Sequence, residues 1–157
     1  MTYARNTDVS PEQTKAEIER TLRRYGADQF MYGYDRQQGI VGFRAFGRSV
    51  RFLVPLPDPK EERFLYTPAR RYERSAKQQA EAYEQEAKRI WRALLLAIKA
   101  KLEVVESGIA TFEEEFMSYI VLPDNTTVGQ WMTPQIAKAY EEGLMPSLLP
   151  ALGTGSE

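Results

Sequence analysis

A helical stripe of apolar and small residues in the middle of the chain constrains its fold most. Its members recur at intervals of three or four positions, the spacing that places side chains on one helix face: Tyr72, Ala76, Ala80, Tyr83, Ala87, Ile90, Leu94, Ile98, Leu102 and Val105. Because Pro68 suits a first turn and Ser107-Gly108 suits an end, the stripe predicts one helix from about Pro68 to Glu106. Such a helix would be about 57 Å long. It must therefore break or project beyond the domain, and we expect its more apolar half, Ile90–Leu102, to be buried on several sides.

The segment before this helix predicts a shorter helix and a small sheet. Ser10 as N-cap, Pro11 in the first turn and Gly26 after the end indicate a helix over residues 10–25. Alternating apolar and polar residues then indicate three strands, at Gln29–Tyr34, Ile40–Phe46 and Ser49–Val54. A turn over residues 35–39 and a tight reversal at residues 47–48 would make them an antiparallel meander.

The segment after the long helix predicts short elements. Thr111 and Glu114 have the spacing of a capping box for a helix that ends near Tyr119. A brief extended piece and a turn follow over residues 120–125. We expect the apolar residues of segment 128–132 to dock on the core, and Thr133-Pro134 to begin a helix that ends near residue 142.

Together these elements predict an α+β fold: an N-terminal helix, a three-stranded antiparallel meander, then a long helix and a mostly helical C-terminal part. Residues 1–66 would form the α+β subdomain. Residues 67–150 would form the helical part, packed on the sheet as one domain, and residues 151–157 a disordered tail.

Two residue types are missing, which limits the chemistry. The chain has no histidine and no cysteine, which excludes disulfides, thiol nucleophiles, zinc sites of Cys and His, and imidazole bases. No acidic residue occurs between Gln37 and Pro57, so a metal-dependent nuclease with carboxylates on its central strands is also excluded. We expect a protein that is not an enzyme and needs no cofactor or metal.

Hydropathy indicates no membrane partner. The N-terminus lacks the apolar core of a signal peptide, and the longest apolar run, Ala93–Ile98, is far too short to span a bilayer. We expect a cytoplasmic location.

Charge is divided along the chain. Residues 1–102 carry 20 Lys and Arg against 13 Asp and Glu, whereas residues 103–157 carry only Lys138 against nine acids. The two parts either neutralise each other in the fold or face different partners, and the sequence leaves both alternatives open.

Several motifs in the second half resemble those of a protein family. They lie between Trp91 and Trp131 and include Ile98-Lys-Ala-Lys-Leu-Glu, Phe112-Glu-Glu-Glu-Phe and Val121-Leu-Pro-Asp-Asn-Thr-Thr-Val-Gly-Gln-Trp. With Gly47-Arg-Ser-Val-Arg-Phe, they resemble a family of small uncharacterised proteins from bacteriophage, prophage and metagenomic sequences. The resemblance implies a viral context, and thus the cytoplasm of a host cell, but no activity and no functional residues.

The first functional hypothesis is nucleic-acid binding. The order helix, three antiparallel strands, helix is that of double-stranded-RNA-binding domains, which contact phosphates through a basic helix N-terminus. At the corresponding position this chain has its densest basic cluster, here called the basic patch: Arg70, Arg71, Arg74 and Lys77. Arg44, Arg48 and Arg51 on the strands would extend it. The partner would be DNA or RNA, bound by backbone and shape.

The alternative hypothesis is a protein-binding module. A helix whose apolar stripe extends beyond its domain often pairs with another helix. The chain would then form a homo-oligomer, or inhibit or redirect a host protein, through its helices and its acidic C-terminal third.

Overall fold

The computed structural model describes residues 4, 6–35, 38–69 and 72–145. Helix α1 (Pro11–Arg24) begins at a capping box in which Ser10 and Gln13 exchange side-chain and backbone hydrogen bonds. Its inner face buries Ile18 and Leu22. The predicted first helix is confirmed.

Three strands follow and form an antiparallel sheet in the order β1-β2-β3, as predicted: β1 (Gln29–Asp35), β2 (Gln38–Ala45) and β3 (Arg48–Pro55). Alternate residues of β2 and β3 are buried on one face, here called the inner face. The reversal between β2 and β3 places Phe46 and Gly47 at positive φ, 52° and 74°, the backbone of a two-residue hairpin turn.

The long helix, α3 (Ala76–Glu106), begins eight residues later than predicted. Its N-cap is Ser75, which forms a capping box with Gln78. The residues just before α3 pair with residues 65 and 66 instead of continuing the helix. The Arg74 amide donates to the Leu65 carbonyl, and Tyr66 and Glu73 form an antiparallel bridge. Pro68 therefore does not start a helix.

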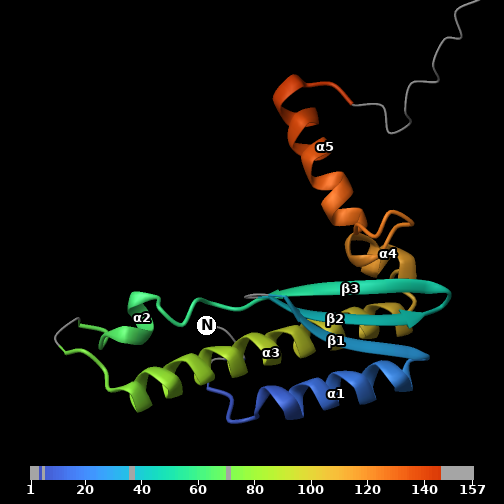
Figure 1. The fold of residues 1–157 in the computed structure, drawn as a ribbon. Helices are drawn as coiled ribbons and strands as arrows, with labels where there is room; N and C mark the ends of the chain where they lie inside the picture. Colours follow the sequence, from blue (N-terminus) through green and yellow to red (C-terminus); the bar gives the residue numbers. More distant parts are fainter. Residues whose placement is uncertain (1–3, 5, 36–37, 70–71, 146–157) are drawn as a thin grey trace, which may run out of the picture.

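The first turns of α3 project beyond the sheet, as the expected length required (Figure 1). No residue from Ala76 to Glu86 is buried. A short helix, α2 (Glu62–Leu65), packs against this end, and buried Phe64 lies with its ring centroid 5.6 Å from that of Tyr83.

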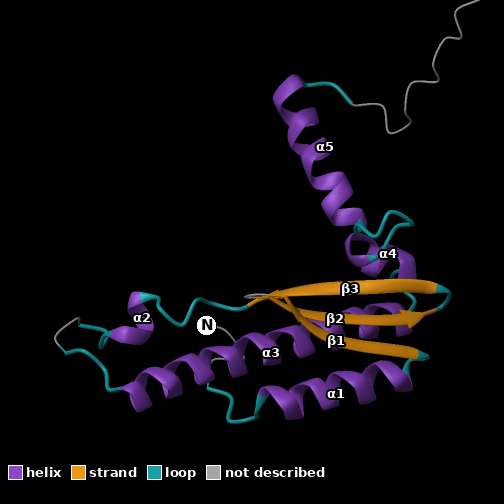
Figure 2. Ribbon diagram, viewed as in Figure 1, coloured by secondary structure: helices purple, strands orange, loops and turns teal. Residues whose placement is uncertain are grey.

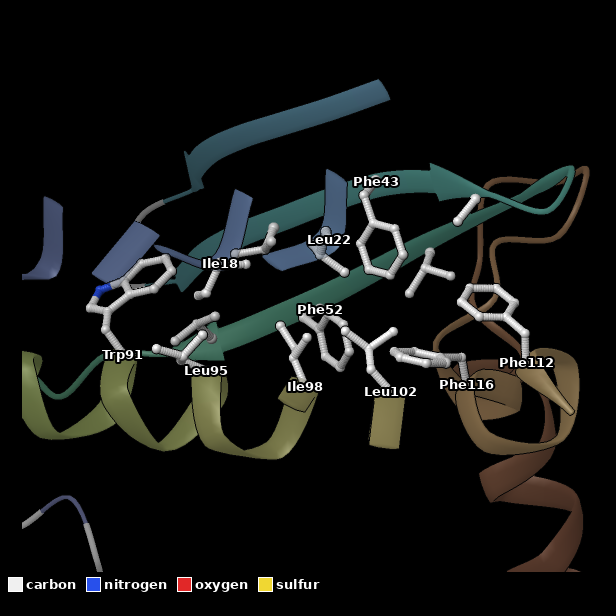
Figure 3. Packing of buried hydrophobic residues seen from close by; sticks show 14 residues of the cluster. Ile18, Leu22, Phe43, Phe52, Trp91, Leu95, Ile98, Leu102, Phe112 and Phe116 are labelled. Atoms are coloured by element: carbon white, nitrogen blue, oxygen red, sulfur yellow. The ribbon is translucent and has the colours of Figure 1, made fainter. Parts of the chain in front are cut away.

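The residues of α3 that face the core are Ala87, Trp91, Leu95, Ile98 and Leu102. The predicted stripe was therefore wrong by one position at Ile90 and Leu94, which are only partly buried. α3 has two adjacent apolar stripes, and the stripe that contains Trp91 packs against the sheet. Figure 3 shows Trp91, Leu95, Ile98 and Leu102 pointing at the sheet alongside Ile18 and Leu22.

The chain after α3 returns to the free edge of β3. Helix α4 (Phe112–Phe116) begins at the expected capping box of Thr111 and Glu114, and a 3-10 helix, η1 (Met117–Tyr119), follows. Phe112 and Phe116 complete the core. Ile120 then bridges Val50, as the predicted extended piece requires.

The last helix, α5 (Val128–Glu142), differs from its prediction. It begins six residues before Pro134, at a capping box formed by Thr127 and Gln130, and Pro134 lies inside it. None of its residues is buried, so segment 128–132 does not dock on the core as expected.

The arrangement is α+β, as predicted. α1 and α3 lie on the same side of the sheet, and α5 leaves past β3 on the side of the molecule opposite α1 (Figures 1 and 2). In the described ranges, no helix has the length and apolar character needed to cross a membrane. The predicted disordered tail, 151–157, lies outside the described residues.

Candidate interaction surfaces

Among the described residues, the predicted basic side chains do not form one surface. Arg48 begins β3 and forms an ion pair with Glu113, just beyond the C-terminal end of α3. Lys77 lies in the first turn of α3, and a helix of 31 residues, about 46 Å long, separates the two ends. Figure 1 shows the β2–β3 turn and the start of α3 at opposite ends of the molecule.

At the start of α3, two residues of the basic patch can be placed. Arg74 precedes the N-cap, and its side chain has no ion-pair partner within the described ranges. The Lys77 side chain is 86% exposed and lies 3.8 Å from Glu81. Arg70 and Arg71 lie outside the described residues.

Arg44 and Arg51 lie on the other face of the sheet, here called the outer face. Strand register places Arg44 beside Ser49, and Arg51 beside Gly42 and Met31. They line a shallow hollow of about 360 Å³ that is also bounded by Asn125.

Arg51 is fixed in this hollow. Its guanidinium donates to Asn125 Oδ1 at 3.2 Å, to the Asn125 carbonyl at 2.7 Å and to Gln130 Oε1 at 3.3 Å. Its Nε is buried without a hydrogen-bond partner in the described structure. Arg51 thus attaches the start of α5 to the sheet, and Arg44 is the freer cation: it is exposed and has no ion-pair partner among the described residues.

The turn that presents Asn125 is well defined. Asn125 has a φ of 67°, the left-handed region that asparagine tolerates. Hydrogen bonds from the Thr126 hydroxyl and amide to Asp124 hold the pKa of that carboxyl below its ordinary value. Asp124 is therefore ionised at neutral pH and acts as a turn residue.

The acidic helix α4 also has structural partners. The Glu114 carboxylate caps its own helix, and the hydrogen bond from the Thr111 backbone amide holds the pKa of Glu114 low. Glu113 pairs with Arg48, and Glu115 with Lys101 at 3.1 Å. Among the described residues no group of three carboxylates has the geometry to hold a metal ion.

The surface that the sequence interpretation missed is on α5. The helix has an apolar face, here called the α5 face, whose members fall on one side at helical spacing: Val128, Trp131, Met132, Ile136, Ala139 and Tyr140. Trp131 is 42% exposed, Ile136 50% and Tyr140 88%. The periodicity is visible in the sequence from residue 128 onward, but the prediction divides it into a segment that docks on the core, 128–132, and a separate helix that begins at Thr133-Pro134.

Comparisons with protein-family models, with curated proteins and with solved structures found no match to this chain. The resemblance to a phage family therefore stays a prediction.

Proposed function

We propose that this protein acts by binding and that α5 is the element that attaches it to another protein. The carrying observation is the α5 face, which presents Trp131, Ile136 and Tyr140 to solvent on a helix with no buried residue. Large apolar side chains that gather on one exposed surface are typical of protein interaction sites. Aromatic residues are enriched at such sites.

Helix energetics support the same proposal. A helix of 15 residues is marginal in water when it stands alone. Pro134, inside the helix, lowers its intrinsic stability further, by about 3 kcal/mol relative to alanine. Hydrogen bonds at its start fix the first turn, but nothing within the described chain covers the rest. A partner that covers the α5 face would supply the missing stabilisation.

Photo-crosslinking from the α5 face tests the proposal. A benzophenone amino acid replaces Ile136 in one protein and Ala137, which is exposed on the side of α5 away from Val128 and Ala139, in a control. We expect position 136 to give a cross-linked product whose partner is named by mass spectrometry, and position 137 to give much less of it. The change Ile136→Asp should then abolish binding of that same partner. Equal products from the two positions would contradict the proposal.

Nucleic-acid binding is a second candidate function, favoured by Arg74. Its guanidinium lacks an ion pair among the described residues and stands beside exposed Lys77 at the start of a helix, where the helix dipole favours phosphate. Arg44, Arg48 and Arg51 are too distant to extend this site. The interface would therefore be the basic patch alone.

Retention on double-stranded DNA and RNA at increasing salt tests this second candidate. We expect Arg74→Glu, alone and together with Arg70→Glu and Arg71→Glu, to lower retention and to reduce its salt dependence. Arg23→Glu, on the exposed side of α1, makes the same change of charge as the single variant and should have less effect. Retention that is unchanged in the triple variant would rule this function out.

A further inference from the structure

We propose that the partner of α5 is a second copy of this chain: the α5 face of one molecule packs on the outer face of the sheet of the other, and the contact is reciprocal. This inference rests on the proposed function of α5. It adds the surface on which α5 packs, the outer face, which is the second uncovered apolar surface of the same molecule.

The outer face is apolar at its centre. Strand register places Gly33, Ile40 and Leu53 in one row across the sheet, and Met31, Gly42 and Arg51 in the next. Met31 is 57% exposed and Leu53 40%. Both described sheet-packing helices, α1 and α3, lie on the inner face (Figure 1), so no described helix covers the exposed Met31 and Leu53 side chains.

The dimensions of the two surfaces match. The eight residues of β2 or β3 extend for about 27 Å, and the 15 residues of α5 for about 22 Å. The sheet has three strands, whose outer members lie about 10 Å apart, close to the diameter of one helix. One helix therefore covers the outer face.

Charge also favours the pairing. The outer face carries Arg44 and Arg51 against Asp35, an excess of one positive charge. α5 carries Glu141 and Glu142 against Lys138, which lies 3.8 Å from Glu142, an excess of one negative charge. Arg44 has no ion-pair partner within the described part of its own chain. A twofold axis would bring these opposite excess charges together twice, because the same two surfaces meet in both halves of the dimer.

α5 cannot cover the outer face of its own chain, because its first turn is attached at η1. The capping box at Thr127 fixes the first turn of α5. A Cβ at Gly129 would lie 2.9 Å from the Ser118 carbonyl oxygen, so the helix is packed tightly against η1 at that point. α5 is then continuous to Glu142 and leads away from its own sheet. A second copy is therefore the occupant that the geometry favours.

Cysteine pairing tests the contact, since the chain has no cysteine of its own. Leu53→Cys protein and tagged Ile136→Cys protein are mixed and treated with a short bismaleimide. We expect a mixed product that joins position 53 of one chain to position 136 of the other. Ala137→Cys, on the other side of α5, in place of Ile136→Cys should give much less. Absence of the mixed product, or linkage only between two thiols at position 136, would overturn the inference.

A chain with both Leu53→Cys and Ile136→Cys distinguishes a second copy from the same chain. At dilution, the inference predicts that linkage falls with concentration. Linkage within a single chain at every dilution would contradict it. If the mixed product is absent while the benzophenone at position 136 captures a different protein, the inference fails and the proposed function stands.

Sedimentation provides the quantitative test. We expect the wild-type protein to dimerise, and Leu53→Glu or Ile136→Asp to raise the dissociation constant of the dimer at least tenfold, because each buries an unpaired charge. Arg44→Glu should weaken the dimer more than Arg23→Glu does. Circular dichroism confirms that each variant is folded. A wild-type monomer from micromolar to millimolar concentration would contradict the inference.

Discussion

At the scale of single residues, Gly39 shows how a buried ring fixes the identity of a strand residue. The sequence interpretation assigned Gly39 to a turn, whereas it lies in β2 on the inner face. A Cβ built there would lie 2.9 Å from Trp91 Cζ2 and 3.2 Å from Cη2. The Trp91 side chain is buried and packed in the core, so its ring cannot move away from an added Cβ without disturbing its neighbours. Periodicity alone could not reveal this role, because it depends on a contact between residues 52 positions apart.

We predict that Gly39→Ala lowers the free energy of unfolding by about 1–3 kcal/mol, the cost of forcing extra volume into a packed core. Gly33→Ala is the matched control, since its added Cβ would meet Ile40 at an ordinary 3.8 Å. Urea unfolding of both variants measures the difference. A loss in Gly39→Ala no larger than in Gly33→Ala would show that Trp91 adapts.

At the scale of elements, helix starts follow a local signal that the sequence interpretation used only in part. The pattern of Ser or Thr followed three residues later by Glu or Gln marks the starts of α1, α3, α4 and α5. Prolines at 68 and 134 were given more weight than Ser75 and Thr127, which made two predicted helix starts wrong. The same pattern at Thr14 and Glu17 lies inside α1, so the signal also needs its context.

The pairing of α1 with α3 depends partly on Glu17. Its carboxylate accepts hydrogen bonds from Arg92 and from Lys99, each at 2.7 Å. The Lys99 bond first, and then Arg92, hold the pKa of Glu17 below its ordinary value against the opposing effect of burial. The pKa of Glu17 is thus lower in the folded chain than in the unfolded chain. The stabilisation is complete above the unfolded pKa and is lost as pH falls through the folded one.

We predict that Glu17→Gln costs about 1 kcal/mol of stability at pH 7. The difference from the wild-type protein should shrink below about pH 4.5, where the unfolded carboxyl begins to bind a proton. Glu19→Gln should cost less, because Glu19 pairs only with Arg23 of its own helix among the described residues. Unfolding of all three proteins at pH 7 and pH 3.5 measures both effects. A constant difference across this range would contradict the role of Glu17.

At the scale of the whole molecule, the charge division of the sequence is partly resolved by the fold. Arg48 with Glu113 and Lys101 with Glu115 join the basic part of the chain to the acidic part at one end of the sheet. The basic residues that the sequence grouped together were separated because strands and α3 position them at different ends. The α5 face was not recognised as a site, because an amphipathic pattern does not specify whether its cover comes from the same chain.

Hydrogen exchange along α5 tests the central claim, that this helix is uncovered in one molecule and covered by another. Amide exchange is followed by mass spectrometry in dilute and in concentrated protein. We expect fast exchange over residues 128–142 at dilution, protection of α5 by at least about tenfold when concentrated, and high protection of α3 under both conditions. An α5 that is as protected as α3 at every concentration would contradict the account.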